Sequence, residues 1–194
     1  EAGHMTIDAN GPVHVTGQKG PWEYYASGNA LNRIVQKEAA EGNFNWAVEQ
    51  AGSWEGVTSH HFSLAVKNQE PDSLRILDYF CQKVSTGLTN LILLLDLDTV
   101  VISGGVCEIG EPLRHGIETW VQNILIGNKH RPKIEVKLAE LGADSALYEK
   151  WGKLHRFSYA AVSGICGAQS VLFMKILIEL FTNTTAQASQ NGVI

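Results

Sequence analysis

The clearest pattern along the chain is a run of apolar residues spaced three and four apart between Asp72 and Leu95. This spacing places the apolar side chains on one face of an α-helix. The face comprises Leu74, Leu77, Cys81, Val84, Leu88, Leu91 and Leu95. Asp72 follows Pro71, and an aspartate is a favourable N-cap. The pattern therefore predicts a helix from about residue 72 to 95, ended by Asp96-Leu97-Asp98.

Strand and helix patterns alternate after this long helix. Thr99–Ser103 is a β-branched run typical of a buried parallel strand, and Gly104-Gly105 stops it abruptly. A helix over about residues 112–126 is expected next. A further strand is indicated by the alternation of Ile134, Val136 and Leu138. This order of elements favours an α/β fold.

The first third of the chain is less regular. Residues 1–23 are glycine-rich, with short alternating pieces that suggest strand edges, and Asn10-Gly11-Pro12 predicts a turn. Ser27 is positioned as the N-cap of a helix over about residues 28–40. Residues 41–57 carry three aromatic side chains in a loop or short helix.

Composition narrows the class of protein. With 194 residues, 44% of them apolar, the chain can bury the core of one globular domain. Lys plus Arg total 15 against 20 for Asp plus Glu, a net charge of −5, and no cationic run is present. Phosphate backbones need clustered cations, so no nucleic-acid partner is expected. The odd number of widely separated cysteines indicates a reducing compartment, the cytoplasm.

The apolar stretch from Val171 to Phe181 is too short to span a bilayer and carries Lys175 and Glu179. It predicts a buried helix over about residues 166–181, and no membrane partner is expected.

Four motifs stand in a fixed order along the chain. They are Glu1-Ala2-Gly3-His4-Met5, residues 17–31 with Trp22-Glu23-Tyr24-Tyr25-Ala26-Ser27-Gly28-Asn29-Ala30-Leu31, residues 94–106 with Ser103-Gly104-Gly105, and residues 138–148 with Gly142-Ala143-Asp144-Ser145-Ala146. In this order they resemble the ROK (repressor, open reading frame, kinase) family, and the second is most similar to its glucokinases. The resemblance implies an incomplete actin-like ATPase (ribonuclease H-like) lobe over residues 1–148, a mixed sheet with flanking helices. Residues 149–194 are a divergent tail.

The resemblance implies a sugar site at Glu1, His4 and Glu23. Carboxylates and an imidazole suit a hexose, because its hydroxyls both donate and accept hydrogen bonds. The alternative is structural: Glu1 is a chain end, His4 is a turn residue, and Glu23 is a helix-start carboxylate favoured by the macrodipole.

The resemblance also implies that Ser103, Gly104 and Gly105 contact the adenosine of ATP, used with Mg²⁺. Glycine lets the backbone approach a ligand closely. The alternative is a tight strand-to-helix turn that needs a positive φ. The sequence Gly142–Ala146 is expected to turn into a helix capped by Asp144 or Ser145, with a structural role.

Family members hold a structural zinc ion with one histidine and three cysteines. Here His14, Thr16 and Pro21 stand at the cysteine positions, so only His4 and His14 remain as ligands. Two ligands do not close a tetrahedral site, and zinc is not expected. The loop must then rely on packing, with Trp22, Tyr24 and Tyr25 as the candidates. Histidines without metal spacing are expected at the surface, namely His60, His61, His115, His130 and His155.

Kinases of this family carry the phosphate loop and the catalytic aspartate in an amino-terminal lobe, and neither motif is present in this chain. No catalytic residue is therefore assigned. The leading hypothesis is a fragment of an ATP-dependent glucokinase that is inactive alone, with glucose as the preferred hexose and a homodimer implied by the family. The exact hexose and the choice between ATP and polyphosphate stay open. Alternatives are the effector lobe of a sugar-responsive repressor and a non-catalytic remnant.

Overall fold

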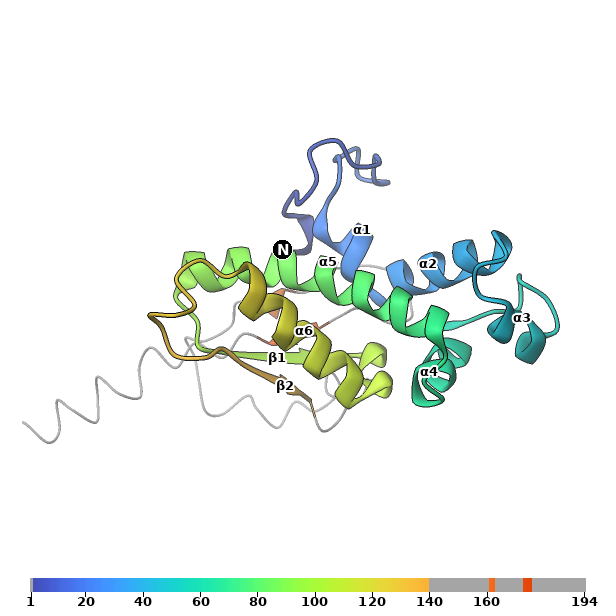
Figure 1. Cartoon of the computed structure of the whole chain (residues 1–194). Helices are drawn as coiled ribbons and strands as arrows, with labels where there is room; N and C mark the ends of the chain where they lie inside the picture. The colour runs from blue at the N-terminus through green and yellow to red at the C-terminus, as the bar shows by residue number, and fades with distance from the viewer. Residues whose placement is uncertain (1, 140–160, 163–172, 176–194) are drawn as a thin grey trace, which may run out of the picture.

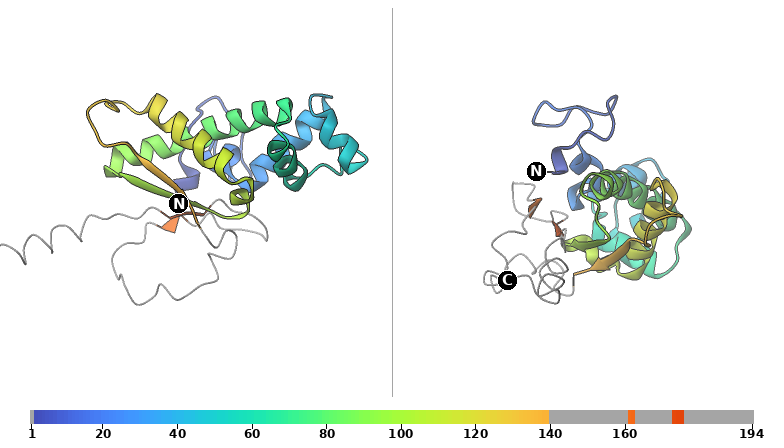
Figure 2. Two further views of the ribbon diagram at one scale, coloured as in Figure 1. Left: turned by 60° about the horizontal axis from the view of Figure 1, so that its bottom comes forward. Right: turned by 90° about the vertical axis from the view of Figure 1, so that its left-hand side faces the viewer.

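The structure, a computed structural model, describes residues 2–139, 161–162 and 173–175. Helices lie on one face of a small mixed sheet, with α5 and α6 side by side above β1 and β2 (Figures 1 and 2). The helical elements are η1 Ala2–His4, α1 Trp22–Ala26, α2 Gly28–Ala40, α3 Asn45–Ala51, α4 Ser59–Lys67, α5 Pro71–Leu95, η2 Gly105–Ile109 and α6 Glu111–Ile124. The strands are β1 Thr99–Ser103, β2 Glu135–Leu138, β3 Ala161–Val162 and β4 Phe173–Lys175.

The long predicted helix is confirmed as α5, but its predicted cap is wrong. Glu70 is the N-cap, and its Oε2 accepts a hydrogen bond from the Ser73 backbone N–H at 2.7 Å. Asp72 lies inside the first turn, because Pro71 takes the first helical position, where its fixed φ and missing N–H are tolerated. The predicted apolar face is buried except at its ends, since Leu74 is 37% exposed and Leu95 is only partly buried.

The predicted strands β1 and β2 are confirmed, and they pair in parallel with Thr99 opposite Glu135. The sheet order is β2-β1-β4-β3, and β4 runs antiparallel to β1. The predicted helix over residues 166–181 is therefore wrong at residues 173–175, which form β4. An apolar run can suit either element, and here the second edge of β1 supplies backbone hydrogen-bonding partners. The rest of that predicted helix and the predicted turn at Gly142–Ala146 lie outside the described residues.

The helices of the first half enclose most of the core. Helix α2 begins as predicted, with the Ser27 Oγ accepting from the Ala30 N–H at 3.1 Å. Helix α4 was not predicted; its capping box pairs Thr58 with His61, whose Nδ1 accepts from the Thr58 N–H at 3.2 Å. Among the largest fully buried side chains are Phe44, Phe62, Phe80, Leu31 and Ile76.

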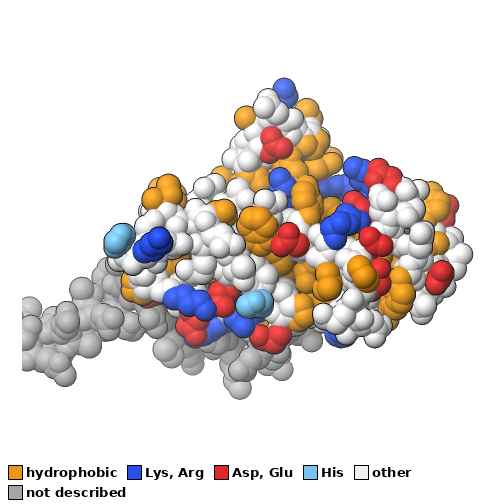
Figure 3. All heavy atoms as spheres, viewed as in Figure 1, with side chains coloured by type: hydrophobic (Ala, Val, Ile, Leu, Met, Phe, Trp, Pro, Cys, Tyr) orange, Lys and Arg blue, Asp and Glu red, His pale blue; other side chains and the backbone are white. Residues whose placement is uncertain are grey.

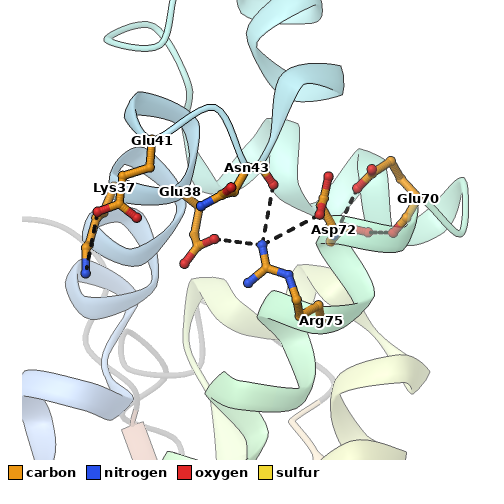
Figure 4. A network of polar contacts seen from close by, with 8 residues as sticks. Lys37, Glu38, Glu41, Asn43, Glu70, Asp72 and Arg75 are labelled. Atoms are coloured by element: carbon orange, nitrogen blue, oxygen red, sulfur yellow. Dashed lines mark hydrogen bonds and ion pairs between the residues drawn. The ribbon is translucent and has the colours of Figure 1, made fainter.

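A polar network joins the end of α2 to the start of α5 (Figure 4). The Arg75 guanidinium donates to the Glu38 carboxylate at 2.7 Å and to the Asn43 carbonyl at 3.4 Å, and it lies 3.6 Å from the Asp72 carboxylate. The Glu38 carboxylate raises the pKa of Arg75. Because the Arg75 side chain is half exposed, such a pair contributes only about 0–1 kcal/mol. The network therefore links the two helices but adds little to stability.

The surface in Figure 3 carries acidic and basic side chains interspersed over the helices. No helix within the described ranges combines the length and the apolar content that crossing a bilayer requires.

Helix α1 packs on α5 with Trp22 at the contact. Trp22 is 3% exposed, and its indole N–H donates to the Lys83 carbonyl at 3.1 Å. Its ring lies against Gly87, where an added Cβ would come within 2.1 Å of Trp22 Cε2. Glycine at position 87 is therefore what lets the two helices approach.

We predict that Gly87→Ala destabilises the protein, although glycine-to-alanine changes in helices usually stabilise by about 0.5–1 kcal/mol. Overpacking against the indole should outweigh that gain and give a net loss of about 2 kcal/mol in urea unfolding. In a Trp22→Phe background, whose smaller ring leaves room, the cost of Gly87→Ala should fall by at least about half. An equal cost in both backgrounds would show that the indole does not set this contact.

Candidate functional site

The candidate sugar-binding region is a loop of residues 5–21 that connects η1 to α1 and projects from the helical layer (Figure 1, dark blue). Its base is closed by the Trp22 N–H donating to the Met5 carbonyl at 2.8 Å. Further out, the Ile7 N–H donates to the Gly20 carbonyl at 3.0 Å, and the His14 N–H to the Gln18 carbonyl at 2.8 Å. The predicted strand edges are thus present as isolated bridges of a nested hairpin.

Two turns shape this loop. The predicted turn near Asn10-Gly11-Pro12 begins at Asp8, whose carbonyl accepts from the Gly11 N–H at 3.0 Å. Gly11 does not take a positive φ there; it is required because an added Cβ would come within 2.3 Å of Tyr25 Oη. At the tip, Gly17 takes a φ of 80°.

Three of the candidate side chains meet at the base of the loop. His14 Nε2 lies 3.4 Å from Glu23 Oε1, and the His4 and His14 rings are 6.5 Å apart between centroids. Glu23 also lies against Gly3 of η1, where an added Cβ would be 3.4 Å from Glu23 Oε2. The structure therefore brings His4 and Glu23 into one region, while Glu1 lies outside the described residues.

His14 is the residue whose place beside Glu23 the sequence did not predict. It was expected only as a remnant of a metal site, yet its ring contacts the predicted sugar-binding carboxylate. Its other nitrogen, Nδ1, lies 3.2 Å from the Thr16 hydroxyl, so both ring nitrogens have polar neighbours. The side chains of His14 and Glu23 are 20% and 24% exposed, so the pair is sheltered but open to a ligand. One signal in the sequence could have indicated this contact. His14 and Thr16 are two residues apart, so in an extended segment their side chains point to the same side.

The residues present do not fit the family's zinc site. Thr16 shares its hydroxyl with His14, and Pro21 is the N-cap of α1 and offers no side-chain ligand. Within the part of the chain that the structure describes, no three His, Cys, Asp or Glu side chains form a group that could hold a metal ion. That zinc is not held by the protein stays a prediction.

Packing of aromatic residues around the loop was also predicted, and the three candidates differ. Tyr25 is buried and bonds to the loop through its hydroxyl, which donates to Asp8 Oδ2 at 2.9 Å. Trp22 packs on α5 instead, and Tyr24 lies under the Arg33 guanidinium, 3.9 Å from its ring centroid. Of these three side chains, Tyr25 is therefore the one that hydrogen-bonds to the loop.

The second candidate region lies where β1 ends. Ser103 is 2% exposed, and Gly104 takes φ 99° and ψ −178°, a conformation that is essentially restricted to glycine. Gly105 is exposed and begins η2. The expectation of a strand-to-helix turn with positive φ is therefore confirmed for Gly104. Adenosine contact by Ser103, Gly104 and Gly105 stays a prediction.

Helix α4 makes a polar contact with η2, which follows this turn: His60 Nδ1 lies 3.4 Å from Glu108 Oε1. Nearby, the Cys107 thiol donates to the Ile102 carbonyl at 3.3 Å, and burial raises the pKa of this thiol, which keeps it neutral. The predicted surface histidines His60, His115 and His130 are exposed, His61 is half-buried as a cap, and His155 lies outside the described residues.

The chain is similar to proteins of one known family. The ROK family matches residues 1–149. A glucokinase of Streptomyces coelicolor is 28% identical over 159 residues, which cover 76% of this chain and 47% of that protein. A xylose repressor of Bacillus subtilis is 32% identical over 108 residues, 56% of this chain and 24% of the repressor. The solved structure of a ROK family glucokinase from Streptomyces griseus in complex with glucose and AMPPNP has a TM-score of 0.69 and 30% identity, over 74% of this chain and 47% of that one.

Fold and loop together define a mixed α/β lobe of the kind found in sugar kinases and their relatives. The chain belongs to the ROK family. It spans about half the length of the glucokinases it matches.

We predict opposite outcomes for the two adjacent glycines at the end of β1. Gly104→Ala should lower the free energy of unfolding by about 1–3 kcal/mol, because alanine is strained at this φ and ψ. Gly105→Ala should change it by less than about 0.5 kcal/mol, because that residue is exposed and has no positive φ. Urea unfolding of both variants checks this, and similar losses for the two would contradict the assigned turn.

Proposed function

We propose that this chain supplies the sugar-binding and adenosine-side walls of an ATP-dependent hexose kinase with glucose as its substrate. The observation that supports the sugar wall is the meeting of His4, His14 and Glu23 at the base of one loop. The similarity to glucokinases, one of them solved with glucose and AMPPNP, gives that cluster its chemistry.

In this proposal the Glu23 carboxylate accepts hydrogen bonds from sugar hydroxyls, and the imidazole of His4 donates or accepts from another direction. A charged acceptor in a partly sheltered position makes a stronger hydrogen bond than a neutral one. His14 holds Glu23 in place from the side of the loop. Glu1 is proposed as a further sugar ligand from its position in the opening motif.

The adenosine wall is proposed at Ser103, Gly104 and Gly105. Gly105 fits this role because it is exposed and has no Cβ, so a flat group can lie close to the backbone. Bound ATP, with Mg²⁺, would supply the phosphoryl group. The chain's own part is to bind and orient the two reactants and to exclude water between them.

The catalytic aspartate and the phosphate loop are proposed to come from an amino-terminal lobe, because neither motif is present in this sequence. Without these parts the chain should bind weakly and should not phosphorylate sugar. A cytoplasmic location and a homodimer belong to the same proposal.

The alternative is a sugar-responsive repressor, and the similarity to the xylose repressor supports it. Both alternatives use the same loop to bind a sugar. They differ in the amino-terminal part of the protein. A kinase has a phosphate loop there, and a repressor has a helix-turn-helix.

Glucose titration of a protein that joins this chain to a kinase-type amino-terminal lobe tests the sugar wall. Glu23→Ala should weaken glucose affinity at least about tenfold, because a hydrogen bond to a charged group contributes about 1.5–3 kcal/mol. Glu49→Ala is the matched control, since Glu49 is an exposed carboxylate on α3. Unchanged affinity in Glu23→Ala, or an equal loss in both variants, would contradict the site.

A further inference from the structure

The residues of the loop 5–21 do not fit the family's metal ion, so other contacts are needed to close the loop. Its backbone hydrogen bonds fix the hairpin but do not attach it to the side of α1. What attaches the loop then decides whether His14 and Glu23 meet.

Asp8 makes the attachment. Its Oδ1 accepts from the Asn10 N–H at 3.1 Å, which fixes the carboxylate over the turn. Its Oδ2 accepts from the Tyr25 hydroxyl at 2.9 Å. One carboxylate thus joins the turn of the loop to helix α1.

Two glycines allow close approaches at this turn, one within the loop and one between the turn and α1. An added Cβ at Gly20 would lie 1.9 Å from the Asp8 carbonyl oxygen, and Gly20 takes a φ of 52°. An added Cβ at Gly11 would lie 2.3 Å from the Tyr25 hydroxyl. Gly20 therefore lets the two strands of the hairpin approach each other, and Gly11 lets the Asp8 turn lie directly against Tyr25.

The other side of the loop is held by Gln18. Its side-chain amide donates to the His4 carbonyl, and it donates to the Thr6 hydroxyl at 3.0 Å. This attaches the tip of the hairpin to the strand that leads out of η1. Gln18 and Asp8 therefore act on opposite strands of the hairpin.

Helix α1 links this attachment to the candidate site, because Tyr25 and Glu23 are two residues apart on the same five-residue helix. We propose that the Asp8–Tyr25 hydrogen bond, supported by Gln18, closes the loop in place of a metal ion and so positions His14 against Glu23. Asp8 and Tyr25 are positioning residues in this proposal. Its importance for sugar binding depends on the proposed function, but the closing of the loop does not.

The protonation of Tyr25 agrees with this role. Burial, with the neighbouring Asp8, raises the pKa of the Tyr25 hydroxyl to about 12. The hydroxyl therefore stays a donor throughout neutral pH. Because the pKa is higher in the folded chain, its stabilising contribution is complete below the ordinary tyrosine pKa of about 10 and is lost as pH rises toward 12.

Hydrogen exchange of peptides from the loop, measured on the full chain, tests the closing. Tyr25→Phe should speed exchange about tenfold, since it removes one hydrogen bond to a charged acceptor. Tyr24→Phe is the matched control: the Tyr24 ring lies under Arg33 and its hydroxyl makes no hydrogen bond among the described residues, so exchange should stay within about twofold of the parent. Excess EDTA should leave exchange unchanged.

An NMR measurement distinguishes a specific effect on the His14–Glu23 contact from a general loosening of the loop. Glu23→Gln should shift the His14 ring signals in NMR spectra of the parent chain, and the same substitution should shift them much less in a Tyr25→Phe background. Asp8→Asn, which keeps one acceptor oxygen, should give an intermediate response if Tyr25→Phe fails to fold.

Stoichiometric zinc in the purified protein, with the loop opened by EDTA, would overturn the proposal. So would equal exchange in Tyr25→Phe and Tyr24→Phe. A closed loop in a protein that binds no glucose would instead contradict the proposed function alone.

Discussion

The contact between the Trp22 indole and Gly87 is the constraint on which the rest of this lobe depends. It fixes α1 on the middle of α5, the longest helix, and the indole hydrogen bond to the Lys83 carbonyl sets its orientation. Because α1 has only five residues, it could not hold a position by its own helical stability. Its side chains are placed by docking.

Once α1 is docked, its neighbouring side chains serve different partners. Tyr25 bonds to Asp8 and Glu23 contacts His14, so the projecting loop is attached to the same helix that carries the candidate sugar-binding carboxylate. A loop attached by side chains can keep this arrangement without a metal ion. The chain has no cysteine at the family's ligand positions, and Gly11 lets the turn approach Tyr25 of α1 closely.

The two adjacent glycines in the turn after β1 differ in what the structure requires of them. Gly104 is required by its backbone conformation, whereas Gly105 is not. The sequence alone does not show which of two adjacent glycines the backbone conformation requires. The backbone conformation explains the first glycine and not the exposed second one, whose contact with adenosine stays a prediction.

Local patterns in the amino-acid sequence were enough to predict α2 with its Ser27 cap, the long helix α5, the strands β1 and β2, and helix α6. The sequence motifs also led to the prediction of a sugar site at Glu1, His4 and Glu23, which stays a prediction. Only the tertiary structure placed His14 beside Glu23, made Glu70 the cap of α5, and turned residues 173–175 into a strand against β1. Each of these outcomes depends on which distant or neighbouring group is available to satisfy a polar atom, and the periodicity of one segment does not carry that information.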